Sequence, residues 1–345
     1  MSLKIAQISP ADSSAQDAFV GAHPDGTPFH GSGWSALVEK TMGVGNQTLI
    51  AYRDGAVVGV LPLGLVSAAL GGRRLVSSAY GVYGGAIAED QETATALDRA
   101  ARGLAKALKV RSLEFRYLRK PATDDLTDVD LYQTFRKALP ETVDEVLGMI
   151  PRKARAEVRK ARDRHGMTMT ENADLLDDFY HLYCMNKRGL GSPLFRRSYF
   201  KTLLDIFGER ALLHAVRHED RTVGAVVSLV QGDTIYPYYS GALPEAGRLG
   251  VNNAMYGFLM EDAVERGFGL FDFGRSRVST GPAAFKRNMG FEATPLTYQF
   301  YLPQGGEPPN LNPSNPKTAI PQKILSSLPM WMAQAVGPTL MRHVP

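Results

Sequence analysis

The sequence predicts two similar α/β domains in tandem, because strand and helix patterns alternate and recur in the same order in both halves. A chain of 345 residues is long enough for about two domains. Residues 50–60 read as a strand, a turn and a second strand with a Val-Gly-aliphatic step, and residues 213–225 repeat this arrangement. A single repeat of this length indicates a duplicated domain and not a solenoid.

The first half is expected to contain helices and strands in alternation. Helices are predicted at residues 34–42 and 93–108, and strands at residues 48–53, 56–66, 73–78 and 112–117. Asp54-Gly55 lies between two apolar runs and predicts a hairpin, because both positions of such a turn need a positive φ.

The second half repeats the order and ends in a tail. Helices are predicted at residues 151–166, 175–186, 198–207 and 252–266, and strands at residues 211–218, 222–231, 234–240, 270–273 and 296–301. We therefore expect an N-terminal domain (1–140), a C-terminal domain with the working site (141–302) and a Pro-rich tail with a short helix (303–345). Residues 121–130 are predicted to be a polar linker or loop, and residues 303–321 an extended segment.

The composition fits an ordinary globular protein. Hydrophobic residues make up 44% of the chain and charged residues 21%, with a formal net charge of +4. The single cysteine, Cys184, excludes a disulfide within the chain and a zinc site built from several cysteines. The sequence shows no signal peptide, no apolar run of membrane-spanning length and no metal-binding cluster, so we predict a cytoplasmic location.

A strongly basic helix is expected after Pro151, which suits a helix start, and before Gly166, which suits a helix end. It carries seven cations in thirteen positions, among them Arg152, Arg155, Arg159 and Lys160. These four are candidate contacts to phosphate, either on an RNA backbone or on the diphosphate of a nucleotide-linked substrate. The alternative interpretation is a solvated amphipathic helix.

A buried strand that ends in Asp272-Phe273-Gly274 and a later helix with Phe285-Lys286 form the second candidate site. The ends of strands in α/β folds are places where polar side chains meet ligands. Lys286 is suited to stabilise an oxyanion or a carboxylate, and Asp272 to orient an amine nucleophile. The alternative is that Asp272 caps a turn and Lys286 lies on the surface.

The third candidate is the aromatic strand that carries Tyr238 and Tyr239, followed by a Gly-rich loop and a helix that starts near Asn252. These residues, together with Phe285, are candidates for binding an acyl or peptide group. Such tyrosines are more often part of a core. The chain has no Gly-x-Ser-x-Gly elbow and no Walker-type phosphate loop.

Together these three segments resemble the FemAB family. Its members are paired acetyltransferase-like (GNAT-like) domains that move an amino acid from aminoacyl-tRNA onto a cell-wall precursor. The likeness rests on a basic helix that ends in residues 159–166, on residues 272–274, and on the Phe-Lys-x-x-x-Gly phrase of residues 285–290. It implies a fold of two tandem GNAT-like domains, with mixed sheets flanked by helices, and a Lys286 that meets the carbonyl or carboxylate during transfer.

The opening of the chain also resembles the branch of this family found with exosortase and PEP-CTERM systems of exopolysaccharide-producing bacteria. Residues 23–30 with Trp34, residues 59–63 and residues 83–85 carry this likeness, and residues 315–317 with 337–338 add to it. The coiled-coil insertion common in enzymes that act on staphylococcal-type walls is absent. The first domain is expected to be degenerate, since Glu114-Phe115-Arg116 is its nearest counterpart of residues 272–274.

The leading hypothesis is direct N-acyl transfer to an amine of a nucleotide-linked or polysaccharide-related acceptor, without a covalent enzyme intermediate. Lys286 would stabilise the oxyanion, and Tyr239 and Asp272 would position the acceptor. No tightly bound cofactor is expected. The donor is aminoacyl-tRNA or acyl-coenzyme A, and residues 246–253 have the wrong spacing for the loop that binds the pyrophosphate of coenzyme A.

A hypothesis from another class is a non-catalytic adaptor in exopolysaccharide or envelope assembly. In that case the first domain and the tail bind a partner or a membrane surface, and residues 330–332 insert at the interface. The simpler interpretation is a tail packed on its own domain.

Overall fold

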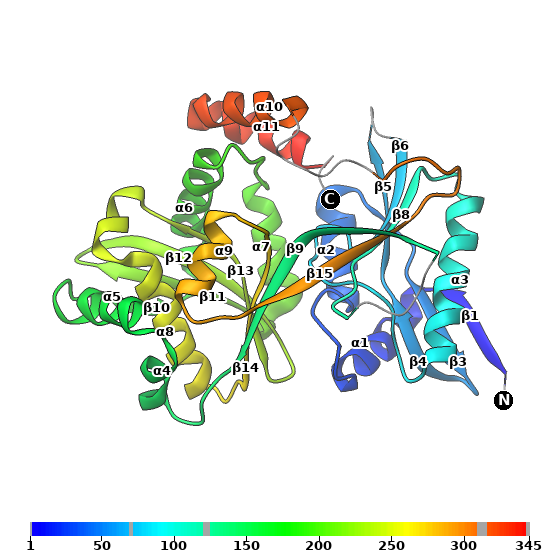
Figure 1. Ribbon diagram of the computed structural model, residues 1–345, viewed down its shortest axis with the longest axis horizontal. Coiled ribbons are helices and arrows are strands. Elements are labelled where there is room, and N and C mark those ends of the chain that lie inside the picture. The colour runs from blue at the N-terminus through cyan, green and yellow to red at the C-terminus, as the bar shows by residue number, and fades with distance from the viewer. Residues whose placement is uncertain (1, 69–71, 120–124, 309–315, 343–345) are drawn as a thin grey trace. The chain divides into compact units, whose positions relative to one another are not determined.

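The computed structural model describes residues 2–68, 72–119, 125–308 and 316–342. The chain forms two compact units, each with mixed sheets flanked by helices (Figure 1). The first unit comprises Met1–Leu131, Pro295–Leu311 and Arg342–Pro345, and the second comprises Tyr132–Thr294 and Asn312–Met341. The mixed α/β class predicted from the sequence is confirmed.

Two strands make this division differ from the expected one. β15 (Ala293–Tyr301) pairs through Gln299–Tyr301 with β8 (Ser112–Phe115), so its end belongs to the first unit. The sequence had placed it in a domain over 141–302. β9 (Thr127–Ala138) begins inside the segment 121–130 that was expected to be a loop. Its first residues alternate between exposed polar and partly buried apolar side chains, a short strand pattern that the prediction of a loop did not take into account.

The first unit is built from two antiparallel hairpins and a parallel strand pair. One of its sheets has the strand order β1 (Leu3–Gln7), β3 (Leu49–Arg53), β4 (Ala56–Leu61) and β7 (Ile87–Ala88). Another set has β2 (Gly45–Asn46), β5 (Leu63–Ala68), β6 (Gly72–Ser77) and β8, with β15 beside β8. Its helices are α1 (Ser13–Ala22), α2 (Ser32–Met42) and α3 (Gln91–Ala107).

The turn between β3 and β4 has the predicted hairpin geometry. Asp54 has φ +51° and Gly55 has φ +88°, as a two-residue turn of this kind requires. The single strand expected over residues 56–66 is wrong, because Pro62 divides it into β4 and β5. Proline has no backbone N–H to donate to a neighbouring strand, so pairing stops there.

The second unit has one sheet with helices on both faces. Its strand order is β10 (Thr168–Glu171), β11 (Ala211–His218), β12 (Arg221–Gln231), β13 (Thr234–Ala242), β14 (Leu270–Arg277) and β9. Its helices are α4 (Val143–Met149), α5 (Arg152–Asp163), α6 (Leu176–Gly189), α7 (Arg197–Phe207), α8 (Val251–Glu265), α9 (Gly281–Asn288), α10 (Pro316–Ser327) and α11 (Met330–Met341).

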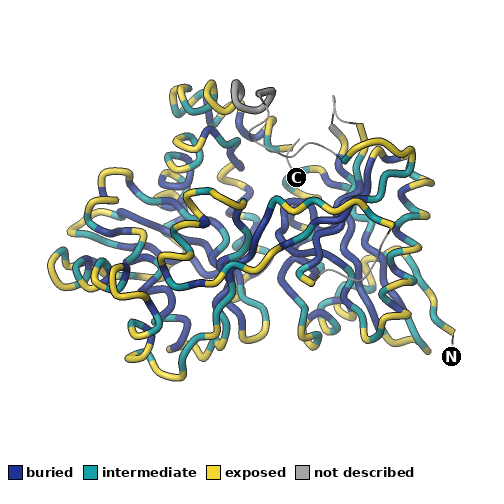
Figure 2. Tube along the Cα trace, viewed as in Figure 1, coloured by how far each residue is buried: buried dark blue, intermediate teal, exposed yellow. Residues whose placement is uncertain are grey.

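Two glycines show which helix covers which face of this sheet. A Cβ on Gly224 would lie 3.0 Å from Val251 of α8, and a Cβ on Gly241 would lie 2.4 Å from the backbone of Leu182 in α6. Ala225, the neighbour of Gly224, pairs with Gly241. Because successive residues of a strand point to opposite faces, α8 and α6 cover opposite faces of the sheet. The strands between them are buried along most of their length (Figure 2).

The extended segment expected over residues 303–321 is wrong at its C-terminal end, because α10 begins at Pro316. Residues 309–315 lie outside the described part of the chain. Proline at the first position of a helix loses no backbone hydrogen bond, which makes Pro316 compatible with a helix start. No helix within the described residues is long and apolar enough to cross a membrane.

Helix α5 packs closely on α8 through its small and branched side chains. Ala154, Val158 and Ala161 are buried, and a Cβ on Gly257 of α8 would lie 2.9 Å from both methyl groups of Val158. A branched valine has little rotational freedom to move away. Gly257 therefore allows the two helices to approach.

We expect Gly257→Ala to lower the free energy of unfolding by about 1–2 kcal/mol, because overpacking outweighs the gain in helix propensity. Gly103→Ala is the matched control, since Gly103 is an exposed helical glycine with open space at its Cβ position. This control should raise the free energy of unfolding by about 0.5–1 kcal/mol. Urea unfolding followed by circular dichroism measures both, and a stabilising Gly257→Ala would contradict the close approach.

Candidate functional site

Strands β13 and β14 pair only at their starts and their backbones separate toward their C-terminal ends, and we call this backbone gap the strand opening. They are parallel, and the pairs Thr234–Leu270 and Ile235–Phe271 lie at the start of both strands. Beyond these pairs β13 continues beside β12, and β14 continues beside β9. The C-terminal ends of parallel strands are where ligands bind in open α/β sheets.

A bulge in the middle of β14 is held by Asp272. The pairing of β14 with β9 shifts between Asp272 and Arg275, and Gly274 within this shift has φ +65°. Asp272 Oδ1 accepts a hydrogen bond of 2.7 Å from the N–H of Gly274. Its Oδ2 lies 3.1 Å from Nε of Arg136 on β9, and the carboxylate is buried. Both carboxylate oxygens of Asp272 thus have a partner at or beside the bulge.

Lys286 lies on α9 with its ammonium against the same bulge. Its Nζ is 2.6, 3.0 and 3.1 Å from the carbonyl oxygens of three successive residues, Phe273, Gly274 and Arg275. A lysine ammonium has three hydrogens to donate, so these contacts use all of them. Burial lowers the pKa of Lys286 to about 7, while Asp272 opposes this shift and Arg275 adds to it. The charge is therefore fixed at the bulge of β14 and is not on the open surface.

Aromatic side chains from α8 and α9 meet beside this bulge. The ring of Tyr256 on α8 lies 4.6 Å from that of Phe273 and 5.6 Å from that of Phe285. Its hydroxyl is 2.9 Å from Oγ of Ser240 on β13. The structure thus brings Phe285 and Lys286 together at the opening. Tyr256 was not predicted from the sequence, although it follows Asn252 by one helical turn and shares its face, and Ser240 belongs to the aromatic strand that was predicted to bind the acyl group.

Tyr239 lies in a different environment from the one expected. It is buried in an aromatic cluster with Phe195 and Phe200, and its hydroxyl is 2.8 Å from that of Tyr199 on α7. Burial raises its pKa well above the ordinary value of 10. Ser240, the next residue, faces α8, so Tyr239 faces the α6 and α7 side. Tyr239 is thus part of the core on that side, and Tyr238 beside it is partly exposed.

The basic residues of α5 form a separate surface, shown by the exposed outer side of this helix in Figure 2. A hollow with a volume of about 680 Å³ is lined by residues of α5 that include the four predicted contacts, Arg152, Arg155, Arg159 and Lys160. Arg162 differs from them, because it pairs with Glu261 and lies 4.9 Å from the ring of Phe258. The structure therefore keeps the four cations together and separates them from Lys286, which does not line this hollow.

The start of α8 is covered by a carboxylate from α5. Gly250 precedes α8 with φ +79°, and a Cβ at this position would lie 3.3 Å from Oε2 of Glu157. Unpaired N–H groups at the start of a helix attract anions such as phosphate. Glu157 supplies negative charge there itself. Asn252 in the first turn of α8 is exposed.

A partly buried lysine on α6 is a residue that the sequence analysis did not single out. Burial lowers the pKa of Lys187, and its Nζ lies 5.7 Å from the ring centre of Tyr183. Within the described residues it makes no ion pair with an acidic side chain. Lys187 stands between Asn186 and Arg188 at the polar end of α6, so the sequence gives no local signal, and its burial comes from packing between elements.

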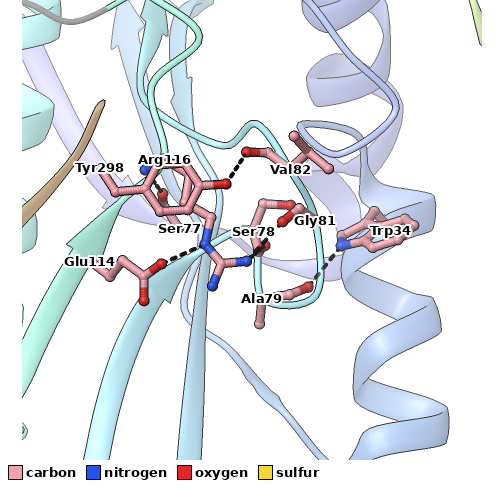
Figure 3. Close-up of polar contacts among 9 residues, drawn as sticks. All are labelled: Trp34, Ser77, Ser78, Ala79, Gly81, Val82, Glu114, Arg116 and Tyr298. Carbon is pink, nitrogen blue, oxygen red and sulfur yellow. Dashed lines mark hydrogen bonds and ion pairs between the residues drawn. The ribbon is translucent and has the colours of Figure 1, made fainter. Parts of the chain in front are cut away.

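In the first unit the corresponding parallel pair, β6 and β8, is closed by an arginine (Figure 3). Arg116 is 2% exposed, and its Nε donates to Glu114 at 2.8 Å. Its Nη1 donates to the carbonyl of Gly81 at 2.8 Å, and its backbone N–H to Oγ of Ser77 at 2.8 Å. Tyr298 places its ring 5.5 Å from this guanidinium. In the first unit, charged and aromatic side chains thus occupy the position beside β6 and β8 that corresponds to the strand opening between β13 and β14.

Comparisons with known proteins agree with these two descriptions. Residues 151–287, which hold α5, the strand opening and Lys286, match the sequence family described as an acetyltransferase (GNAT) domain. No curated protein matches the sequence. The second unit thus carries an acyltransferase domain of the GNAT class, as the sequence predicts.

Several solved structures share the fold at low sequence identity. A structure of FemX is 18% identical with a TM-score of 0.68, and the match covers 87% of this chain and 98% of that one. The C-terminal domain (DUF2156) of a putative lysylphosphatidylglycerol synthetase from Agrobacterium fabrum is 14% identical with a TM-score of 0.56, covering 86% and 92%. A tandem GNAT protein from the clavulanic acid biosynthesis pathway is 12% identical with a TM-score of 0.54, covering 89% and 100%. The predicted tandem arrangement of GNAT-like domains is confirmed.

The lowered pKa of Lys286 predicts a pH dependence of stability. The folded-state pKa of about 7 lies below the ordinary 10.5, so the unfolded chain holds one more proton between these values. The free energy of unfolding should then rise with pH in this window, by at most about 1.4 kcal/mol per pH unit from this group. Lys286→Met removes this contribution. In urea unfolding at several pH values between 7 and 10, the free energy of unfolding of the wild type should increase relative to that of the variant as the pH rises. A difference between the two free energies that does not change with pH would contradict the shift.

Proposed function

We propose that this protein is an N-acyltransferase of the FemAB kind, which moves an aminoacyl group from aminoacyl-tRNA to an amine of a cell-envelope or exopolysaccharide precursor. The GNAT-class domain and the fold shared with FemX support acyl transfer. The choice of aminoacyl-tRNA as the donor rests on the position of α5. This helix has a cationic surface and places Glu157 at the start of α8.

The position of Glu157 argues against coenzyme A as the donor. Acetyltransferase folds bind the pyrophosphate of coenzyme A at the loop before the helix that corresponds to α8. Here the carboxylate of Glu157 lies beside Gly250 in that loop, so it would repel the pyrophosphate at the place where coenzyme A would bind. The cations Arg152, Arg155 and Arg159 lie on α5 instead, where the backbone of an RNA can reach them.

The chemical step needs no covalent enzyme intermediate. The acceptor amine attacks the ester carbonyl of the aminoacyl group, a C–N bond forms, and the C–O bond to the ribose breaks. The ribose oxygen leaves with the proton that the amine gives up. Lys286 stabilises the oxyanion when the substrate oxygen replaces the carbonyl of Arg275, its longest contact at 3.1 Å. Asp272 acts as a positioning residue, because it holds the bulge whose carbonyls orient Lys286.

The remaining predicted residues have roles at the two sides of this opening. Phe285 and Asn252 lie on α9 and α8, which flank it, and Tyr238 lies on β13. We assign them to binding of the transferred group. Tyr239 supports this strand from the core, through its hydroxyl contact with Tyr199. An acceptor of the exosortase and PEP-CTERM branch remains a prediction of the sequence likeness.

Acyl-coenzyme A is the second candidate donor, because the matched family is described as an acetyltransferase domain. The two donors differ in charge pattern and size, so binding separates them. In this alternative the thiol of coenzyme A leaves in place of the ribose oxygen. A non-catalytic adaptor is the third candidate, and it predicts that the cellular function survives Lys286→Ala.

The double variant Arg155→Glu/Arg159→Glu should weaken binding of aminoacyl-tRNA at least about tenfold, because two phosphate contacts are reversed in charge. The matched control is Arg99→Glu/Lys106→Glu, which makes the same charge change on the exposed side of α3. Fluorescence anisotropy with labelled tRNA, repeated over a salt series, measures both. Equal losses in the two variants would reject α5 as the RNA surface. Tight binding of acetyl-coenzyme A in a thermal-shift titration would favour the second donor.

Lys286→Met should lower kcat by about 10²–10³-fold, the range found when an oxyanion-stabilising donor is removed. The wild-type rate should fall as the pH rises above about 7, because the ammonium then loses its proton. In Lys286→Arg the fall should move to higher pH, since a guanidinium keeps its charge. A rate that rises through pH 7 would instead assign Lys286 the role of a general base.

A further inference from the structure

The two C-terminal helices expose an apolar surface that their own packing does not require. Trp331 on α11 is 69% exposed, Leu340 is 41% exposed and Val336 is 40% exposed. Ile324 on α10 is 55% exposed. Leu190, 57% exposed, precedes Gly191, which packs against the backbone of α10 at Gln322. These residues are most of the exposed large hydrophobic side chains in the described part of the chain.

The opposite side of α11 attaches it to the second unit. Ala333, Gly337 and Pro338 are buried, and a Cβ on Gly337 would lie 2.9 Å from the backbone of Leu194. The side chain of Gln334 reaches Sγ of Cys184 on α6 at 3.7 Å. Figure 1 shows α10 and α11 lying over α6. The helix is therefore held in place by one face, and its apolar outer face is presented to the surroundings.

The charge around this face has one sign. No aspartate or glutamate follows Glu307, and α11 contains no charged residue at all. Lys323 is exposed on α10, and Arg342 directly follows α11. This apolar face with cations beside it complements a surface that has an apolar interior covered by a layer of anionic groups. The bilayer interface of anionic lipids has this arrangement.

We propose that α11, together with the end of α10, binds the surface of a bilayer that contains anionic lipids and lies in the interface without crossing it. A helix of 12 residues is too short to span a bilayer. Trp331 enters the headgroup region, where an indole keeps its apolar body in lipid and its N–H in water. At about 100° per residue, Leu340 lies at the opposite edge of the exposed half of α11 from Trp331, and Val336 lies between them, nearer to Leu340. This attachment is independent of the acyl donor and of the acceptor.

A lipid surface explains the composition better than a protein partner does. The five exposed apolar residues lie on two helices and an adjoining turn, without any acidic side chain on α10 or α11 to pair with a partner's cations. A second copy of this chain would offer the same face, with Lys323 and Arg342 as cations and no acidic side chain on α10 or α11 to neutralise them. Anionic headgroups instead neutralise them, at about 1 kcal/mol for each cation near the surface.

The test uses the full chain and vesicles made of phosphatidylglycerol and phosphatidylcholine. Trp34 is 1% exposed, so a change in tryptophan emission on adding vesicles reports on Trp331. We expect a blue shift with these vesicles, and at least a fivefold weaker response with vesicles of phosphatidylcholine alone or in high salt. Trp331→Phe should abolish the shift and should retain co-sedimentation with vesicles.

Trp331→Ser/Leu340→Ser should reduce the vesicle-bound fraction at least tenfold. Val278→Ser is the matched control, because Val278 is 50% exposed and lies outside this face, between β14 and α9. Unchanged circular dichroism and thermal unfolding show that the variants fold. The proposal fails if the wild type does not bind the anionic vesicles. It also fails if the double serine variant and Val278→Ser show the same vesicle-bound fraction. It also fails if ultracentrifugation shows a dimer that the double serine variant dissociates, since the face then binds a second copy.

Discussion

The second unit depends on one ammonium group that is held by three successive carbonyl oxygens at the bulge of β14. Lys286 gives β14 a fixed shape at the point where it leaves β13, and Asp272 fixes the same bulge from the other side through Gly274. Burial makes this charge costly, which is the reason that its pKa falls to about 7. A costly buried charge is retained where charge serves a purpose, and here it lies at the strand ends where acyl transfer is proposed.

The two units use the same parallel strand pair in different ways. In the second unit β13 and β14 separate, and Tyr256 with Phe285 lines the neighbouring wall. In the first unit Arg116 fills the corresponding place and is satisfied by Glu114 and by the carbonyl of Gly81 (Figure 3). A buried guanidinium with all its charge engaged leaves no group free for a ligand. The degeneracy expected of the first domain stays a prediction, and the contacts of Arg116 agree with it.

Helix α5 connects the fold of the second unit with its proposed donor. Its buried face, Ala154 and Val158, fits α8 only because Gly257 has no side chain. This close approach brings Glu157 to the start of α8 and leaves the arginines of α5 on the outer side. One packing contact thus decides two features together: the negative charge at a place suited to phosphate, and the cationic surface suited to RNA.

The sequence by itself determined the features that local physics controls. The Asp54-Gly55 hairpin, the basic helix between Pro151 and Gly166, and the start of the strand at Leu270 all follow from turn geometry and from apolar periodicity. The end predicted for that strand at Gly274 is wrong, because β14 continues past a bulge to Arg277. These signals were enough for the duplicated α/β class and for Lys286 as a residue near a strand end. They rest on neighbours in the chain, so no tertiary information was needed.

Only the tertiary structure decided which side chains meet. Tyr239 was expected at the site, but the pleat of β13 turns it into the core on the α6 side, where it contacts Tyr199. β9 and β15 were misjudged because their partners lie far away in the sequence. The contact of Glu157 with Gly250 depends on how two helices cross. Long-range packing of this kind leaves no periodic pattern in the chain, because each partner is fixed by a segment that folds elsewhere.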